Sequence, residues 1–95
     1  MEKILIICGD CEQAREVKFE ISKDASKMLV IENNDRCKRV FHLPKNITKD
    51  EAIHIISQYY NENGFDEYEK QGKLCIAGQI NGKNYELQSD EISYI

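Results

Sequence analysis

The sequence has little of what builds linkers or membrane segments. It holds one proline and five glycines, and no serine- or glutamine-rich tract, which argues against a long linker or a low-complexity tail. Its longest apolar run, residues 4–8, is far shorter than the about 20 residues of a transmembrane helix or the roughly 7–15 of a signal peptide's apolar core. A chain of 95 residues has room for one core. We therefore expect one domain over residues 1–95, no membrane association and a cytoplasmic setting.

An excess of positive charge is also missing. The chain has 13 basic and 17 acidic residues, a net charge of −4. Residues 1–44 carry eight of each, whereas residues 45–95 carry five bases and nine acids, so all the excess acid lies in the second half. A chain of this charge offers no electrostatic footprint for phosphate, which disfavours direct nucleic-acid binding. The nearest basic cluster, Arg36, Lys38 and Arg39, is predicted to be a solvated strand end.

Most motifs that carry chemistry are absent as well. The sequence contains no nucleophile elbow, glycine-rich phosphate loop, His-Glu-x-x-His pair or paired-carboxylate signature. His42 and His54 are its only side chains that ordinarily titrate near neutral pH. We expect both to be exposed, one on a strand and the other on the polar face of a helix. We therefore predict no catalytic residues, and a protein that is not an enzyme.

Hydropathy patterning predicts a strand-rich first half. Residues 3–8 are apolar at both alternating sets of positions, which is typical of a strand covered on two sides and predicts a central strand. A parallel pair involving this strand stays open, because a later helix leaves enough chain for one crossover. Three further strands follow from alternating or apolar patterns, at residues 15–21, 28–31 and 37–43.

The second half predicts one helix and one hairpin. Thr48 and Glu51 form a capping box that opens a helix over residues 49–63. Asn81-Gly82 between two apolar-alternating segments predicts a tight β-hairpin, with Ile80 opposite Lys83 and Gly78 opposite Tyr85. The expected order is β-β-β-β-α-β-β. This is a single-domain α+β fold, mostly antiparallel, with the helix packed across the sheet.

Cys8-x-x-Cys11 is the one motif with chemical content. Two thiols at this spacing can bind one metal ion or form a redox pair. Together with Cys37 and Cys75 they total four, the number that a closed tetrahedral zinc site uses. Residues 4–15 also resemble the opening of a glutaredoxin, but a strand pattern follows where that family continues a helix. Reduced thiols without cofactor are our first expectation, and a zinc-binding or thiol-redox module is the alternative.

The most unusual stretch is residues 62–69, where four acids are interleaved with two aromatics. These six residues are Glu62, Phe65, Asp66, Glu67, Tyr68 and Glu69. Aromatic side chains favour interface hot spots, and acids steer a basic partner. The alternative is a helix exit whose rings pack under the sheet and whose acids are merely solvated.

These features lead to a functional expectation. We expect a small acidic, non-catalytic protein that binds a basic protein partner, plausibly a nucleic-acid-binding one. In size, acidity and sheet-plus-helix pattern the chain resembles the small inhibitors that phages and mobile elements make against host machinery, anti-CRISPR proteins among them.

Overall fold

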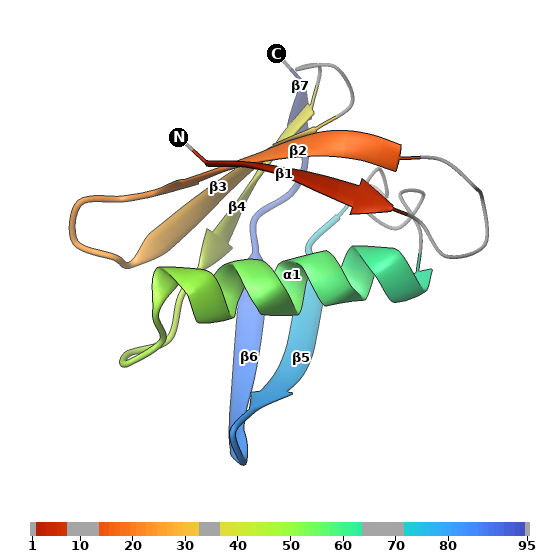
Figure 1. Ribbon diagram of the computed structural model, residues 1–95. Coiled ribbons are helices and arrows are strands. Elements are labelled where there is room, and N and C mark those ends of the chain that lie inside the picture. The colour runs from red at the N-terminus through yellow and green to blue at the C-terminus, as the bar shows by residue number, and fades with distance from the viewer. Residues whose placement is uncertain (1, 8–13, 33–36, 64–71, 95) are drawn as a thin grey trace.

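The computed structural model describes residues 2–7, 14–32, 37–63 and 72–94 and has one helix packed on a mostly antiparallel sheet (Figure 1). The elements are β1 (Glu2–Ile7), β2 (Ala14–Ile21), β3 (Lys27–Glu32), β4 (Cys37–His42), α1 (Lys49–Asn63), β5 (Cys75–Ile80), β6 (Lys83–Ser89) and β7 (Ser93–Tyr94). The predicted α+β fold and its element order are confirmed. The two-residue strand β7 is an addition that the sequence pattern did not indicate. No helix in the described ranges is long and apolar enough to cross a membrane.

The strands lie in the order β1-β2-β3-β4-β6-β5, and every recorded pair is antiparallel. Within the described residues β1 pairs with β2 alone, so the expectation of a central first strand, with a parallel partner left open, is wrong. An apolar run indicates that the two faces of a strand are covered, but it does not indicate whether one or both of its edges pair with a neighbouring strand. The chain meanders through β1 to β4 instead, each strand pairing with its sequence neighbour.

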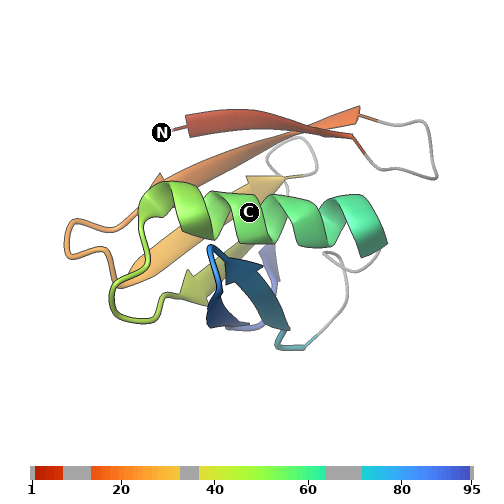
Figure 2. The ribbon, with the colours of Figure 1, turned by 60° about the horizontal axis from the view of Figure 1, so that its bottom comes forward.

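The helix begins where the capping box places it. The Thr48 backbone N–H donates to Glu51 Oε1 at 2.9 Å, and the Glu51 N–H donates to Thr48 Oγ1 at 3.1 Å. The bond from the Thr48 N–H is the main cause that holds the pKa of the Glu51 carboxyl below its usual range. Five residues on one side of α1 are buried: Ala52, Ile53, Ile55, Ile56 and Tyr60. They cover one face of the sheet, as Figure 2 shows, and form the core with the inward side chains of the strands.

The β5–β6 hairpin has the predicted register. Ile80 pairs with Lys83, Gly78 with Tyr85, and Cys75 with Gln88. Asn81 and Gly82 both have positive φ, 50° and 80°, as a type I′ turn requires. The hairpin extends past α1 on the side away from β1 and β2 (Figure 1).

Arg39 corrects the expectation of a solvated basic cluster. Lys38 is exposed and Arg36 lies outside the described residues, but Arg39 is 0% exposed on the core side of β4. Its Nη1 donates to the backbone oxygens of Gly72 (2.8 Å) and Asp90 (3.0 Å) and to Ser89 Oγ (3.1 Å). Arg39 thus lies between the part of β4 that pairs with β6 and the part that pairs with β7. By strand alternation alone, residue 39 lies on the same face of β4 as residues 37 and 41, which belong to the core.

Candidate protein-binding surface

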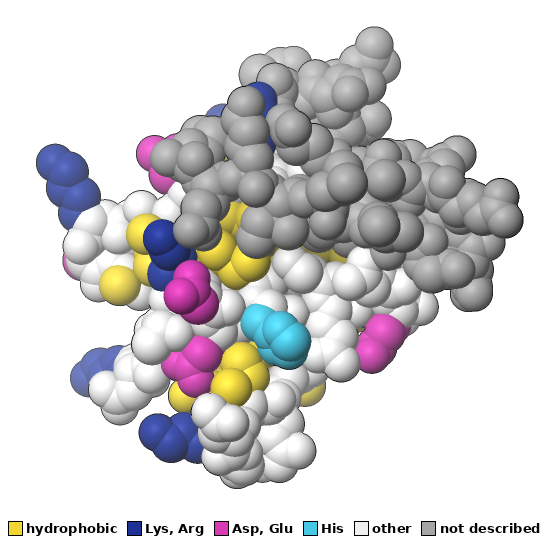
Figure 3. Space-filling view, viewed as in Figure 1, with side chains coloured by type: hydrophobic (Ala, Val, Ile, Leu, Met, Phe, Trp, Pro, Cys, Tyr) yellow, Lys and Arg dark blue, Asp and Glu magenta, His cyan; other side chains and the backbone are white. Residues whose placement is uncertain are grey.

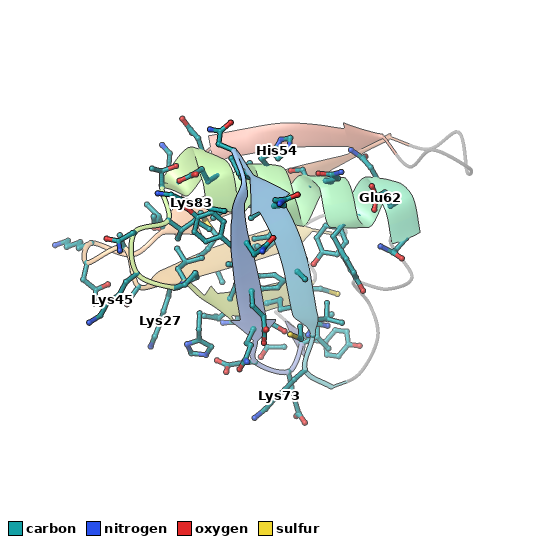
Figure 4. All side chains as sticks on the ribbon, turned by 90° about the horizontal axis from the view of Figure 1, so that it is seen from below. Lys27, Lys45, His54, Glu62, Lys73 and Lys83 are labelled. Carbon is teal, nitrogen blue, oxygen red and sulfur yellow. The ribbon has the colours of Figure 1, made fainter. Side chains whose placement is uncertain are left out.

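One of the six predicted partner-binding residues, Glu62, is described, and it lies beside a hollow. Glu62 is exposed in the last turn of α1, and its Oε1 accepts a hydrogen bond from Gln58 Nε2 at 3.1 Å. The other five predicted partner-binding residues, Phe65, Asp66, Glu67, Tyr68 and Glu69, lie outside the described residues. Figure 4 shows Glu62 at the C-terminal end of α1, and Lys83 of β6 near the opposite end of the helix.

The hollow lies between α1 and β5 and has a volume of about 360 Å³; we call it the α1–β5 groove. Its lining residues are Ile55, Gln58, Tyr59, Glu62, Ala77, Gly78 and Gln79. Among these described residues, Glu62 is the one that carries a charge. The groove therefore combines a negative charge from the helix with the backbone of a strand.

Gly78 lets the helix approach β5 closely. A Cβ at this position would lie 2.8 Å from both Cγ1 and Cγ2 of Ile55, closer than real Cβ contacts. The sequence predicted Tyr85 opposite this glycine, and Tyr85 is indeed its strand partner. The side chain that occupies the space above Gly78, however, comes from the helix.

Beyond the groove, the far side of β5 carries no partner strand in the described part of the chain. Ala77 and Gln79 are exposed, so solvent reaches this strand edge. The groove was not predicted from the sequence. The strand glycine and the hairpin register were visible in the sequence, but the place of β5 at the end of the sheet was not.

Two of the four predicted zinc ligands are described, and they lie on opposite faces of the sheet. Cys37 is 2% exposed and belongs to the core. Cys75 is exposed and pairs with Gln88, which in turn pairs with His42 on the outer face. No group of three or more metal-ligating side chains occurs in the described ranges. Cys8 and Cys11 lie outside those ranges, so a zinc site that includes them stays a prediction.

The Cys75 thiol donates a hydrogen bond to Glu86 Oε1 at 3.2 Å. This bond to the carboxylate is the main cause that raises the pKa of the Cys75 thiol above its usual range. Glu86 also accepts from Gln88 Nε2 at 3.1 Å, and the two bonds lower the pKa of the Glu86 carboxyl. A thiol held protonated in this way is the opposite of an activated nucleophile.

Both histidines are exposed, as expected. His42 Nε2 lies 2.8 Å from Asp90 Oδ1, a pairing that the sequence did not indicate because the partners are 48 residues apart. This hydrogen bond lowers the pKa of the Asp90 carboxyl. His54 lies on the solvent-facing side of α1 (Figure 4).

No protein-family model, curated protein or solved structure matches the chain.

Proposed function

We propose that the protein is a small, acidic binding protein without catalytic activity of its own, which acts by protein–protein interaction on a basic partner. The net negative charge favours a basic target, and a nucleic-acid-binding protein that is inhibited in this way is the target class that we propose first. The observation that carries the proposal is the position of Glu62, the first acid of the segment 62–69, exposed on the wall of the α1–β5 groove. Acids beside a groove can both steer a partner and contact it once bound.

The charge distribution supports a basic partner. All of the net charge of −4 arises in residues 45–95, which include α1, the hairpin and the acidic segment. Among the coloured side chains of Figure 3, acidic ones lie at both ends of α1, and several basic ones gather toward its N-terminal end. A positively charged surface approaching the C-terminal end of α1 would meet an attractive field.

Two further features favour binding over catalysis. The exposed thiol of Cys75 has a raised pKa, which weakens it as a nucleophile at neutral pH. The His42–Asp90 pair is half exposed, with side-chain exposures of 48% and 57%, so water competes for its hydrogen bond. A cytoplasmic setting with reduced cysteines and no bound cofactor is consistent with this function and forms part of the proposal.

A matched pair of baits tests the proposal. The wild-type chain and a variant with Asp66→Asn, Glu67→Gln and Glu69→Gln are used to capture proteins from an extract of the source cells. Each protein that the wild type retains is then purified, and its association rate is measured at several salt concentrations. We expect a basic partner whose association with the amide variant is slower and less salt-dependent, at unchanged melting temperature.

The aromatic residues of the segment supply a second measurement. Phe65→Ala and Tyr68→Ala should speed dissociation if the rings are interface anchors, and should lower the melting temperature if they are core residues. A partner that binds the amide variant with unchanged rate and salt dependence would refute the proposal.

A further inference from the structure

In the described part of the chain, the edge of β5 that faces away from β6 presents a regular row of unpaired backbone hydrogen-bonding groups. Ile80 and Lys83 flank the two-residue turn and therefore form a hydrogen-bonded pair, and bonded pairs then alternate along the hairpin. The bond from the Ser89 N–H to the Leu74 oxygen, 2.8 Å, follows the same alternation at the far end. The N–H and C=O groups of the intervening residues, Cys75, Ala77 and Gln79, point away from β6. We call this row the β5 edge.

Within the described residues, β5 lacks three of the devices that usually protect a terminal strand. Natural sheets blunt their edges with charged side chains, proline or bulges. The sequence of β5, CIAGQI, contains no charged residue and no proline, and its register with β6 runs without a bulge over six residues. The opposite terminal strand, β1, has the sequence EKILII and so carries two charged residues. Of the two ends of the sheet, the β5 end is the one suited to accept another strand.

The α1–β5 groove lies along this edge and limits what can bind there. Ala77 and Gln79 contribute to its lining and belong to the β5 edge, while Glu62 stands on the helix wall. A strand added to β5 would thus run past a carboxylate. We propose that the β5 edge accepts an extended, basic segment of a partner protein as an additional strand, seated next to α1. This inference rests on the proposed binding function and names how the partner docks.

A second copy of this chain is the competing occupant of the β5 edge. Pairing two copies edge to edge would bring together two chains of net charge −4 and two copies of Glu62. Like charges at one interface oppose association, whereas a lysine- or arginine-rich segment would be attracted. The charge therefore favours the basic partner.

Ala77→Pro tests the edge directly. The Ala77 N–H points away from β6, so proline removes a free donor and fills the edge without breaking a bond of the hairpin. Ala77→Val keeps the donor and is the matched control. The probe is a short synthetic peptide of alternating lysine and valine, and a peptide of alternating glutamate and valine serves as its counterpart. Binding is followed by amide chemical shifts and hydrogen exchange on the full chain.

We expect the lysine peptide to slow exchange of the Ala77 and Gln79 amides in the wild type and in Ala77→Val. Ala77→Pro should weaken this binding at least about tenfold. Glu62→Gln should weaken it about two- to fivefold and reduce its salt dependence. If Ala77→Pro lowers the melting temperature by itself, Gln79→Pro is the second variant, since its N–H points the same way.

Several results would overturn the inference. These are the absence of lysine-peptide binding, equal binding of the glutamate peptide, binding that survives both proline substitutions, or protection elsewhere than at the β5 edge. A wild-type dimer that becomes monomeric in Ala77→Pro would assign the edge to a second copy instead, which sedimentation measures.

The captured partner separates this inference from the proposed function. A partner that responds to the amide variant of residues 66–69 but binds Ala77→Pro normally would uphold the proposed function and refute docking at the β5 edge. A partner indifferent to both would refute the two together.

Discussion

Ile55 on α1 lies directly over Gly78 on β5, so close that a Cβ on residue 78 would lie 2.8 Å from two of its side-chain carbons. These carbons, Cγ1 and Cγ2, branch from the Ile55 Cβ, and a β-branched side chain has one strongly preferred χ1 rotamer in a helix, so they move away only at a cost in free energy. The pair therefore sets the distance between the helix and the hairpin. It also sets the width of the α1–β5 groove, because both residues line it.

Gly78→Ala should destabilise the fold by about 1–3 kcal/mol, because the added methyl overpacks a close contact. Ile55→Ala alone should also destabilise, since it empties a position that is 3% exposed. The two changes together should cost less than their sum, and urea unfolding of all four proteins measures this coupling. Strictly additive effects would contradict the contact.

A second prediction concerns Arg39. Arg39→Ala should destabilise the protein by roughly 1–3 kcal/mol, because it leaves the oxygens of Gly72, Ser89 and Asp90 without their charged donor. Lys38→Ala, at the adjacent exposed position, should change the stability by no more than about 0.5 kcal/mol. Chemical denaturation of the two variants makes the comparison. Equal small effects would restore the interpretation of a solvated basic cluster.

A third prediction follows from the turn between β2 and β3. Asp24 Oδ1 accepts hydrogen bonds from the side chains of Ser26 (2.7 Å) and Ser22 (2.8 Å) and from the Ser26 N–H (3.1 Å). These bonds lower the pKa of the Asp24 carboxyl to about 2 from an ordinary 3.8. The folded state thus favours the ionised form, and this stabilisation is fully present above pH 3.8. It is lost as the pH falls through that value toward about 2.

An NMR titration of the Asp24 carboxyl checks this value directly. In Ser26→Ala, which removes the largest cause of the shift, the pKa should rise toward its ordinary value. The difference in melting temperature between wild type and Asp24→Ala should shrink as the pH falls from 4 to 2. A difference independent of pH over this window would rule out the hydrogen-bonded carboxylate.

Much of the local structure could be predicted, because its causes are local in the sequence. The capping residues Thr48 and Glu51 gave the start of α1, and Asn81-Gly82 gave the hairpin register pair by pair. In each case a few neighbouring residues determine the backbone geometry.

The order of the strands depends on contacts between distant segments, and there the sequence was insufficient. The apolar run of β1 did not indicate that this strand lies at the end of the sheet. Arg39 was predicted to be exposed because it is charged, although strand alternation assigns its position to the core. The α1–β5 groove depends on both the edge position of β5 and the approach of Ile55, so it could not be found before the fold.

The last prediction concerns the cysteines. A closed four-cysteine zinc site would need Cys37 and Cys75 together, but one is buried in the core and the other is exposed on the outer face. We therefore expect freshly purified protein to carry no stoichiometric zinc by elemental analysis, and four thiols to titrate after unfolding. Zinc near one equivalent that disappears with Cys8→Ser or Cys11→Ser would favour the metal-dependent module instead. Cys37→Ser and Cys75→Ser are the controls. Because these two residues lie on opposite faces of the sheet, a zinc site built on residues 8 and 11 can include at most one of them, so at least one of the two variants should keep its zinc.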